Sequence, residues 1–268
     1  MAGKGGVGKT TVTAVLARAA ADSGLRVLAV DLDGKPTLGQ LIQGGPDAST
    51  IDHLSLTAAD ALAEYLDTHG LRRVSRRLAT SGVIDMVSTA APGIDDIVVL
   101  GKLKQLERSD TYDLVVVDGP AAGHAISFLL APRGLLDAVR GGPLRTQALD
   151  VLEMLADPAR CQVVLVSLPE TTPMNELVET AYSLEERVGV QLGPVVINGV
   201  DAAALLEVPD DADPVLAAAA RFRNERRRLH QRELARLADE LALEQIHLPH
   251  IATAALGPAD IERLAASL

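Results

Sequence analysis

The feature that most constrains this sequence is a glycine-rich run at residues 3–11, Gly-Lys-Gly-Gly-Val-Gly-Lys-Thr-Thr. The run satisfies the pattern Gly-x-x-x-x-Gly-Lys-[Ser/Thr], in which the glycines let successive backbone N–H groups point inward at phosphate oxygens. A helix expected directly after the run adds its positive N-terminal end. Two of the only five lysines in the chain lie within this run. The run therefore predicts a phosphate-binding loop of an α/β fold.

Each position of the loop has an expected role toward ATP and Mg²⁺. Lys9 is expected to reach the β- and γ-phosphates, Thr10 to give its hydroxyl to Mg²⁺, and Thr11 to stand beside the α-phosphate. The rest of the loop is expected to line the phosphates with its backbone. These residues are Gly3, Lys4, Gly5, Gly6, Val7 and Gly8.

Short β-branched runs separated by helical stretches predict the fold. The expected strands are Arg26–Asp31, Val83–Val87, Asp113–Asp118, Cys161–Leu168, Pro194–Asn198 and Gln245–Leu248. The alternation predicts a doubly wound, mostly parallel α/β sheet with its ligand site at the carboxyl ends of the strands. We expect one domain over residues 1–268, with helical inserts at about 44–82 and 201–243.

The N-terminus departs from the usual arrangement of such a loop. A phosphate-binding loop normally follows a central buried strand, whereas only Met1 and Ala2 precede Gly3. The sequence therefore predicts that the usual first strand is absent from the chain as written. Our preferred explanation is a native start upstream of Met1.

Carboxylates at two strand ends complete the predicted site. Asp33 follows the strand at 26–31 and is expected to position the attacking water, with Asp31 supporting the Mg²⁺ shell. Asp118 ends the next apolar strand and is expected to hold Mg²⁺ through a water. The alternative for Asp33 is a helix N-cap or turn residue.

Composition narrows the classes of function. A net charge of −11 works against binding a nucleic-acid backbone, and the single cysteine, Cys161, excludes an internal disulfide or a cysteine-cluster metal site. No signal peptide or bilayer-spanning run is present, so we expect a cytoplasmic protein, with peripheral membrane contact left open. The arginine-rich stretch at 215–243 carries interleaved Glu and Asp, which favours a salt-bridged solvent face over a nucleic-acid or membrane contact.

The position of Lys4 makes the loop resemble the deviant Walker A motif. This motif is shared by the MinD and ParA ATPases, nitrogenase iron protein, and the arsenite-pump (ArsA) and guided-entry targeting ATPases. In that class the early lysine reaches across a dimer interface to the partner's nucleotide, as an arginine finger does. The resemblance implies that Lys4, Lys9 and Asp33 are the catalytic residues and that hydrolysis waits for dimerisation.

Further motifs resemble the ArsA and guided-entry branch. Residues 118–132 resemble its second switch, with the pair Gly123-His124 as the strongest part, although His124 alone reads as a helix-capping or core histidine. Asn198 corresponds to the asparagine that reads the adenine edge, and Pro249 to the segment that closes over the base. For Asn198 the alternative is an ordinary turn residue. Residues 91–94 and 101–104 look like actinobacterial members of the branch.

The pattern also departs from that branch. One Cys and four Met rule out a Cys-x-x-Cys zinc clasp and give little support to a Met-rich client groove or an arsenite thiolate site. The expected function is therefore dimer-gated, Mg²⁺-dependent ATP hydrolysis by a homodimer, or by a heterodimer with a paralogue, coupled to an unidentified protein client or membrane partner. The alternatives are a MinD- or ParA-like positioning ATPase and a regulatory pseudo-ATPase subunit of a heterodimer.

Overall fold

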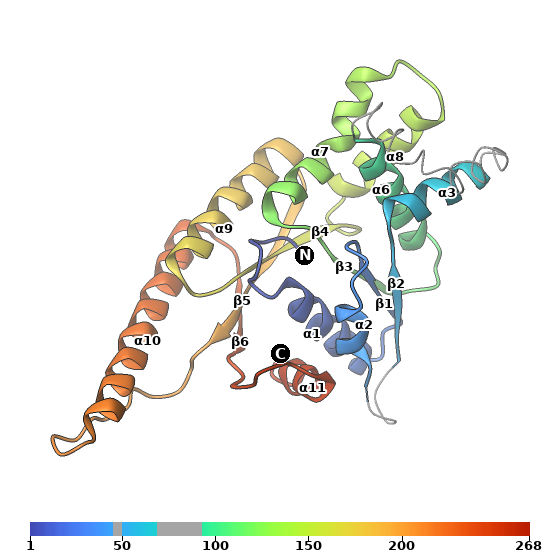
Figure 1. The fold of residues 1–268 in the computed structure, drawn as a ribbon. Coiled ribbons are helices and arrows are strands. Elements are labelled where there is room, and N and C mark those ends of the chain that lie inside the picture. Colours follow the sequence, from blue (N-terminus) through green and yellow to red (C-terminus); the bar gives the residue numbers. More distant parts are fainter. Residues whose placement is uncertain (45–49, 69–92) are drawn as a thin grey trace.

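The computed structural model describes residues 1–44, 50–68 and 93–268, so the predicted strand at 83–87 lies outside the described residues. Six described strands form two three-stranded groups, with orders β2-β1-β3 and β4-β5-β6, and every pairing is parallel (Figure 1). The strands are β1 Val27–Asp31, β2 Ile51–Ser55, β3 Leu114–Asp118, β4 Gln162–Ser167, β5 Gln191–Val200 and β6 Gln245–Pro249. The predicted parallel α/β sheet is confirmed.

Residues 1–3 connect the two groups of strands. Ala2 donates its N–H to the carbonyl of Val164 at 3.0 Å and accepts from the N–H of Val166 at 2.8 Å, both on β4. On the other side, the carbonyl of Gly3 accepts from Ala122 N–H at 3.0 Å, just beyond β3. No full strand precedes the loop within the described residues, but these three residues bridge the position between β3 and β4 where a central strand is expected.

Helices cover both faces of the strands. The described helices are α1 Lys9–Asp22, α2 Thr37–Ile42, α3 Ala58–Thr68, α6 Ile94–Glu107, α7 Ala122–Ala138, α8 Pro143–Ala156, α9 Thr171–Ser183 with the π-helical turn η1 Leu184–Val188, α10 Pro214–Glu240 and α11 Pro258–Ala265. Helices α1, α2 and α11 pack together and bury alternate residues of β1 on one face. Helices α3 and α6 bury the intervening residues, including Leu28 and Val30, on the other.

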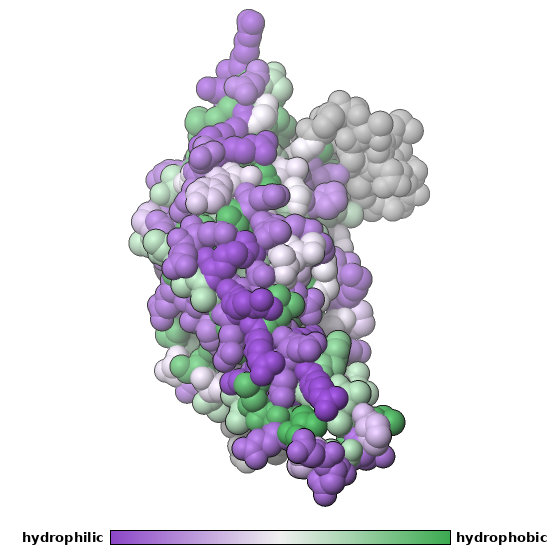
Figure 2. Space-filling view, turned by 90° about the vertical axis from the view of Figure 1, so that its left-hand side faces the viewer, coloured by the Kyte–Doolittle hydropathy of each residue, from purple (hydrophilic) through white to green (hydrophobic). Residues whose placement is uncertain are grey.

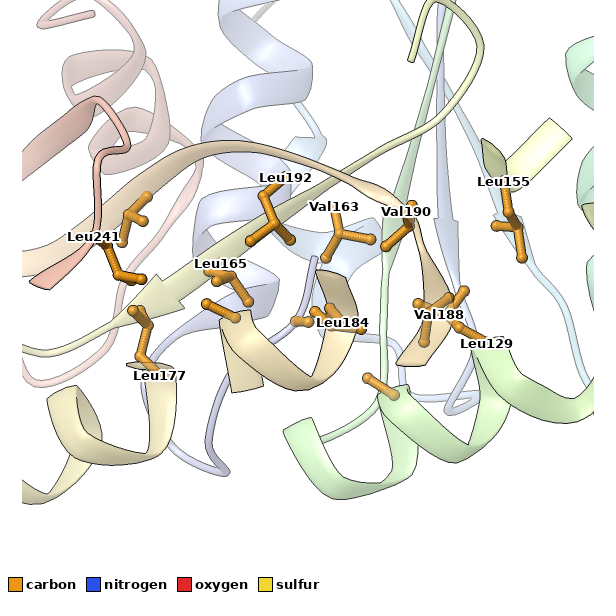
Figure 3. Close-up of a cluster of buried hydrophobic side chains, with 14 of the residues drawn as sticks. Leu129, Leu155, Val163, Leu165, Leu177, Leu184, Val188, Val190, Leu192 and Leu241 are labelled. Atoms are coloured by element: carbon orange, nitrogen blue, oxygen red, sulfur yellow. The ribbon is translucent and has the colours of Figure 1, made fainter. Parts of the chain in front are cut away.

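The largest described core lies between β4 and β5 and the helices α7, α8 and α9. Figure 3 shows Leu165 of β4 and Leu192 of β5 among leucines contributed by these helices, such as Leu129, Leu155 and Leu177. The side chains are aliphatic, which agrees with an aromatic content of only 2%. Cys161 packs against the same cluster, and burial raises the pKa of its thiol, as expected for a structural cysteine.

The two predicted inserts have different outcomes. The region 44–82 was expected to be helical, but Ile51–Ser55 forms β2, which pairs with β1. In the described part of this region only α3 follows β2. Along β2 the more buried positions 51 and 54 are apolar, whereas 52, 53 and 55 are polar and exposed, so β2 lacks the continuous apolar run of a central strand. The second insert, 201–243, contains the predicted long helix α10.

Helix α10 presents a charged surface toward solvent. Arg223 pairs with Asp201 at 2.9 Å, and Arg226 with Glu170 at 3.0 Å. Figure 2 shows this side of the molecule as largely hydrophilic, with apolar side chains gathered toward its lower end, where Figure 1 places the start of α10. The ion pairs agree with the predicted salt-bridged face.

No helix within the described ranges is both long and apolar enough to cross a bilayer.

Candidate nucleotide site

The phosphate-binding loop, which lies in space between β3 and β4, has two positions at which only glycine fits. Gly8 precedes α1 with φ +90°, and a Cβ there would lie 2.2 Å from the side-chain nitrogen of Asn198. A Cβ on Gly3 would lie 2.2 Å from the carbonyl oxygen of Val166. The loop is therefore pressed against the carboxyl ends of β4 and β5, directly before the N-terminus of α1, as a phosphate-binding loop requires.

Lys9 lies over the loop. Its Nζ donates to the carbonyls of Gly3 at 3.3 Å and Lys4 at 3.4 Å, which are long hydrogen bonds. Burial lowers the pKa of Lys9, against the opposing influence of Asp118 and Asp33. Charged phosphate oxygens are stronger acceptors than these carbonyls, so a bound nucleotide can displace both bonds. The role of Lys9 toward the β- and γ-phosphates stays a prediction.

Thr10 and Asp118 meet as predicted for a Mg²⁺ site. The hydroxyl of Thr10 donates to Oδ2 of Asp118 at 2.6 Å, across 108 positions of the sequence. Burial raises the pKa of Asp118, although Thr10 and Lys9 act in the opposite direction. Both groups offer hard oxygen atoms, and a buried carboxylate that is costly to ionise is stabilised by a cation. The residues present therefore fit Mg²⁺.

Residues 31–36, which we call the first switch, contain two aspartates with different surroundings, Asp31 and Asp33. The half-exposed side chain of Asp33 contacts Lys35, with 2.8 Å between Oδ2 and Nζ, and this hydrogen bond lowers the pKa of Asp33. Asp31 is 1% exposed, and its partners lie on β2 and in the turn that follows β1. The sequence assigned Asp31 to the Mg²⁺ shell, whereas in the structure its carboxylate is engaged by His53 and Ser55.

Lys4 is paired with a residue outside its own loop. Its ammonium group pairs with the carboxylate of Glu176 on α9, and both side chains remain partly exposed. Lys9 is therefore the loop lysine that bonds to the phosphate-binding backbone, whereas Lys4 is held by α9. This separation of the two cations was not foreseen, because the partner of Lys4 lies 172 positions away.

Asn198 and Pro249 lie at the carboxyl ends of adjacent strands, on the other side of the loop. The side-chain amide of Asn198 donates to the carbonyl of Val7 at 3.0 Å and so contacts the loop directly. Pro249 ends β6 and pairs in register with Val200 at the end of β5. The structure brings both predicted base-side residues to one edge.

Comparison with known proteins then identifies the family. The model of the anion-transporting ATPase family, ArsA, matches residues 1–140, which include the loop, both switches and β3. The chain belongs to the ArsA ATPase family. The relatives of the chain include ATPase BagA of Mycobacterium tuberculosis, 29% identical over 73% of this chain and 63% of the relative. An arsenical pump-driving ATPase of Escherichia coli is 28% identical over 80% of this chain and 36% of the relative.

The chain spans less than two thirds of the length of these relatives, with 63% and 36% covered. A putative arsenical pump-driving ATPase of Halobacterium salinarum, 27% identical, shows the same limited coverage of 34% of its length. The predicted resemblance to the ArsA branch, including its actinobacterial members, is confirmed by these matches. Residues 101–104, one of the two segments that suggested actinobacterial members, lie in α6. Of the other segment, residues 91 and 92 lie outside the described part of the chain.

The second switch of this ArsA-family chain, residues 118–132, includes the first part of α7. Gly123 and His124 lie in its first turn, and both are exposed. His124 makes no side-chain cap for the helix, and its charge influences the pKa of Asp96 on α6, which burial raises. His124 is therefore neither a core histidine nor a capping residue. Its exposed position at the start of α7 leaves it available to a ligand or a partner.

Four polar residues near the site were missed by sequence reasoning. They are Lys35, His53, Ser55 and Glu176. Lys35 lies two residues from Asp33, so an ion pair between the two could have been predicted from their spacing alone. His53 and Ser55 required recognition of β2, but the residues Ile51–Ser55 show neither a continuous apolar run nor strict alternation. No local pattern marks Glu176.

Proposed function

We propose that this ArsA-family chain is a Mg²⁺-dependent ATPase in which dimerisation gates hydrolysis and ATP drives an open-to-closed cycle coupled to a protein client or a membrane partner. The observation that carries the proposal is that the two lysines of the loop have different partners. Lys9 bonds to the backbone of its own loop, whereas the ammonium group of Lys4 is held by Glu176 on α9. A partly exposed cation that stands beside a phosphate-binding loop without bonding to it is suited to a nucleotide held by a second subunit.

The chain's own residues divide the chemistry among them. The loop backbone and Lys9 bind the β- and γ-phosphates, and Asp33 positions the attacking water once it leaves Lys35. Bound Mg²⁺ supplies charge neutralisation on the phosphate oxygens, and Thr10 and Asp118 are the residues that would hold it. Asn198, at the end of β5, lies where it can hydrogen-bond the edge of adenine.

The arsenical-pump relatives support ATP hydrolysis as the shared activity, and no clustered thiolates for an arsenic substrate are available from a single cysteine. The nature of the client is therefore not carried over from those relatives. Capture identifies the client, and the Asp33→Asn protein trapped with ATP is the suitable bait.

The proposal is tested by measuring ATPase rate per mole of protein against protein concentration. We expect specific activity to rise with concentration, together with an ATP-dependent dimer in analytical ultracentrifugation. Lys4→Ala is expected to lower turnover by at least about 100-fold while retaining nucleotide binding. Constant specific activity without a dimer would refute the dimer gate, and absence of turnover with nucleotide binding intact would favour the pseudo-ATPase alternative.

Lys104→Ala is the matched control for Lys4→Ala. Lys104 is also a partly buried lysine in an ion pair, with Asp150 at 2.7 Å, but it lies on α6, outside the loop. Loss of turnover in both variants would indicate general destabilisation. Loss in Lys4→Ala alone supports the role across the dimer.

A further inference from the structure

Asp31 is a buried carboxylate with an unusually complete set of donors. Its Oδ1 accepts from the N–H of Gly34 at 2.9 Å and from the hydroxyl of Ser55 at 3.0 Å. Its Oδ2 lies 2.8 Å from Nε2 of His53. At 1% exposure, a carboxylate without such partners would be strongly destabilising. The three contacts explain how the fold tolerates the charge.

The register of β1 and β2 brings these groups together. Asp31 is the direct partner of Ser55, and His53 lies two residues earlier, on the same face of β2. The N–H of Leu56 donates to the carbonyl of Asp31 at 2.9 Å and extends the contact past the end of the strand. Both the backbone and the side chain of Asp31 are therefore tied to β2.

His53 is in turn confined by α2. A Cβ on Gly39 of α2 would lie 3.1 Å from the imidazole ring of His53, so the ring packs closely against the helix backbone at this point. A side chain larger than hydrogen at position 39 would press on the ring. The contact leaves the imidazole directed toward Asp31.

The bond from Gly34 to Asp31 fixes the turn that carries Asp33. In the sequence, Asp33 lies between the two residues that this hydrogen bond joins. Its own carboxylate accepts a hydrogen bond from Lys35 on the exposed side. The residue proposed to position water therefore depends on a buried neighbour for its backbone geometry. That neighbour, Asp31, is held in turn by β2, a strand outside every motif of the nucleotide site.

We infer that His53 and Ser55 are positioning residues for the first switch, which hold Asp31 so that its bond to Gly34 sets the placement of Asp33. The inference deepens the proposed function and rests on it for the role of Asp33. Asp31 then serves as an anchor for the switch. His53 and Ser55 lie on β2, outside the phosphate-binding loop, so we expect them to influence turnover and not the affinity for ATP.

The first test uses pairs of variants that remove or retain the hydrogen-bonding group. His53→Leu and Ser55→Ala are expected to lower kcat by about 10- to 100-fold, because small displacements of a positioning group have effects of this size. The dissociation constant of ATP, measured with a fluorescent analogue, should stay within about twofold. His53→Gln and Ser55→Thr retain a donor and are expected to recover much of kcat.

Asp52→Asn provides the control on the same strand. Asp52 accepts a hydrogen bond from Tyr112 on the exposed surface and does not contact Asp31. The Asp52→Asn substitution should leave kcat unchanged, and thermal melting should show that all variants are folded. Equal loss of kcat and of ATP binding in His53→Leu and Ser55→Ala would overturn the inference in favour of a general structural role.

A second measurement does not require hydrolysis. Hydrogen exchange of the Gly34 amide in the nucleotide-free protein should be at least about fivefold faster in Ser55→Ala and His53→Leu than in the wild type, since both release Asp31. Unchanged exchange would overturn the inference. A wild-type chain without ATPase activity would refute the proposed function instead, and the exchange measurement would then decide this inference alone.

Discussion

The two groups of strands end on chemically different residues. In the group β2-β1-β3, two of the strands end on carboxylates, and these residues, Asp31 and Asp118, are directly opposite each other in register. In the group β4-β5-β6 the residues at or near the strand ends are neutral, among them Asn198 and Pro249. The phosphate-binding loop lies between them and bonds to both, through Thr10 to Asp118 and through Val7 to Asn198. We infer that the first group serves the chemistry of the phosphates and the second the recognition of the base.

The largest expected effect belongs to the charged group. Asp33→Asn should lower kcat by at least about 100-fold, because a group that orients water or takes its proton contributes that much, while ATP affinity is retained. Steady-state turnover and equilibrium binding measure the two quantities. Asp137→Asn, an exposed aspartate of α7, is the control. Loss of binding in Asp33→Asn would break the proposed division between the two groups.

The next effect concerns the contact between the loop and the neutral group. Gly8→Ala should weaken ATP binding by about 10-fold or more, because it combines a left-handed backbone with a Cβ placed 2.2 Å from the Asn198 amide. Gly134→Ala, where a Cβ has no heavy atom within 4 Å, should bind normally. Calorimetric titration with a non-hydrolysable ATP analogue is the measurement. Normal binding by Gly8→Ala would contradict the close contact described for the loop.

Asn198 tests the neutral group directly. Asn198→Ala removes the bond to Val7 and the group proposed to read adenine, so ATP affinity should fall by about 5- to 10-fold and the preference for ATP over GTP should narrow. The turnover of saturated enzyme should change little. If the variant instead lost much of its kcat and kept its preference for ATP over GTP, Asn198 would act in hydrolysis and not in recognition of the base.

A smaller effect is expected at the ion pair between Lys4 of the loop and Glu176 of α9. Glu176→Gln removes the ion pair that holds Lys4 on α9, so the protein concentration for half-maximal ATPase activity should fall by up to about fivefold, the range of an exposed ion pair. Glu179→Gln, one turn away on the same helix and exposed, should behave as wild type. A rise in the required concentration would show that Glu176 assists Lys4 instead of retaining it.

The smallest effect lies at the opposite, amino end of the charged group. Arg26 bonds Asp113 just before β1 and β3 begin, and this lowers the pKa of Asp113 from 3.8 to about 2. A carboxyl group whose pKa is lower in the folded than in the unfolded protein stabilises the fold at any pH above its unfolded-state pKa. This stabilisation is lost as the pH falls through the folded-state pKa. The difference in melting temperature between wild type and Asp113→Asn should therefore shrink from pH 4 to pH 2. A constant difference would contradict the shift.

Much of this arrangement was predictable because it follows from local patterns. The glycine spacing predicted the loop, and apolar runs predicted five of the described strands, because buried parallel strands need continuous aliphatic residues. The carboxylates Asp31 and Asp118 were predictable as strand-end residues. The strand β2 was missed because it is short and only two of its five residues, Ile51 and Leu54, are apolar.

The sequence by itself determined the family and the chemical types of residue at the site. Only the tertiary structure decided their partners: Asp31 with His53 and Ser55, Lys4 with Glu176, and Asn198 with the loop. The physical reason is that hydrogen bonds and ion pairs form between groups that the folded chain brings together, here across as many as 191 positions. Residue spacing carries the periodicity of a helix or strand, but it does not carry the register between strands.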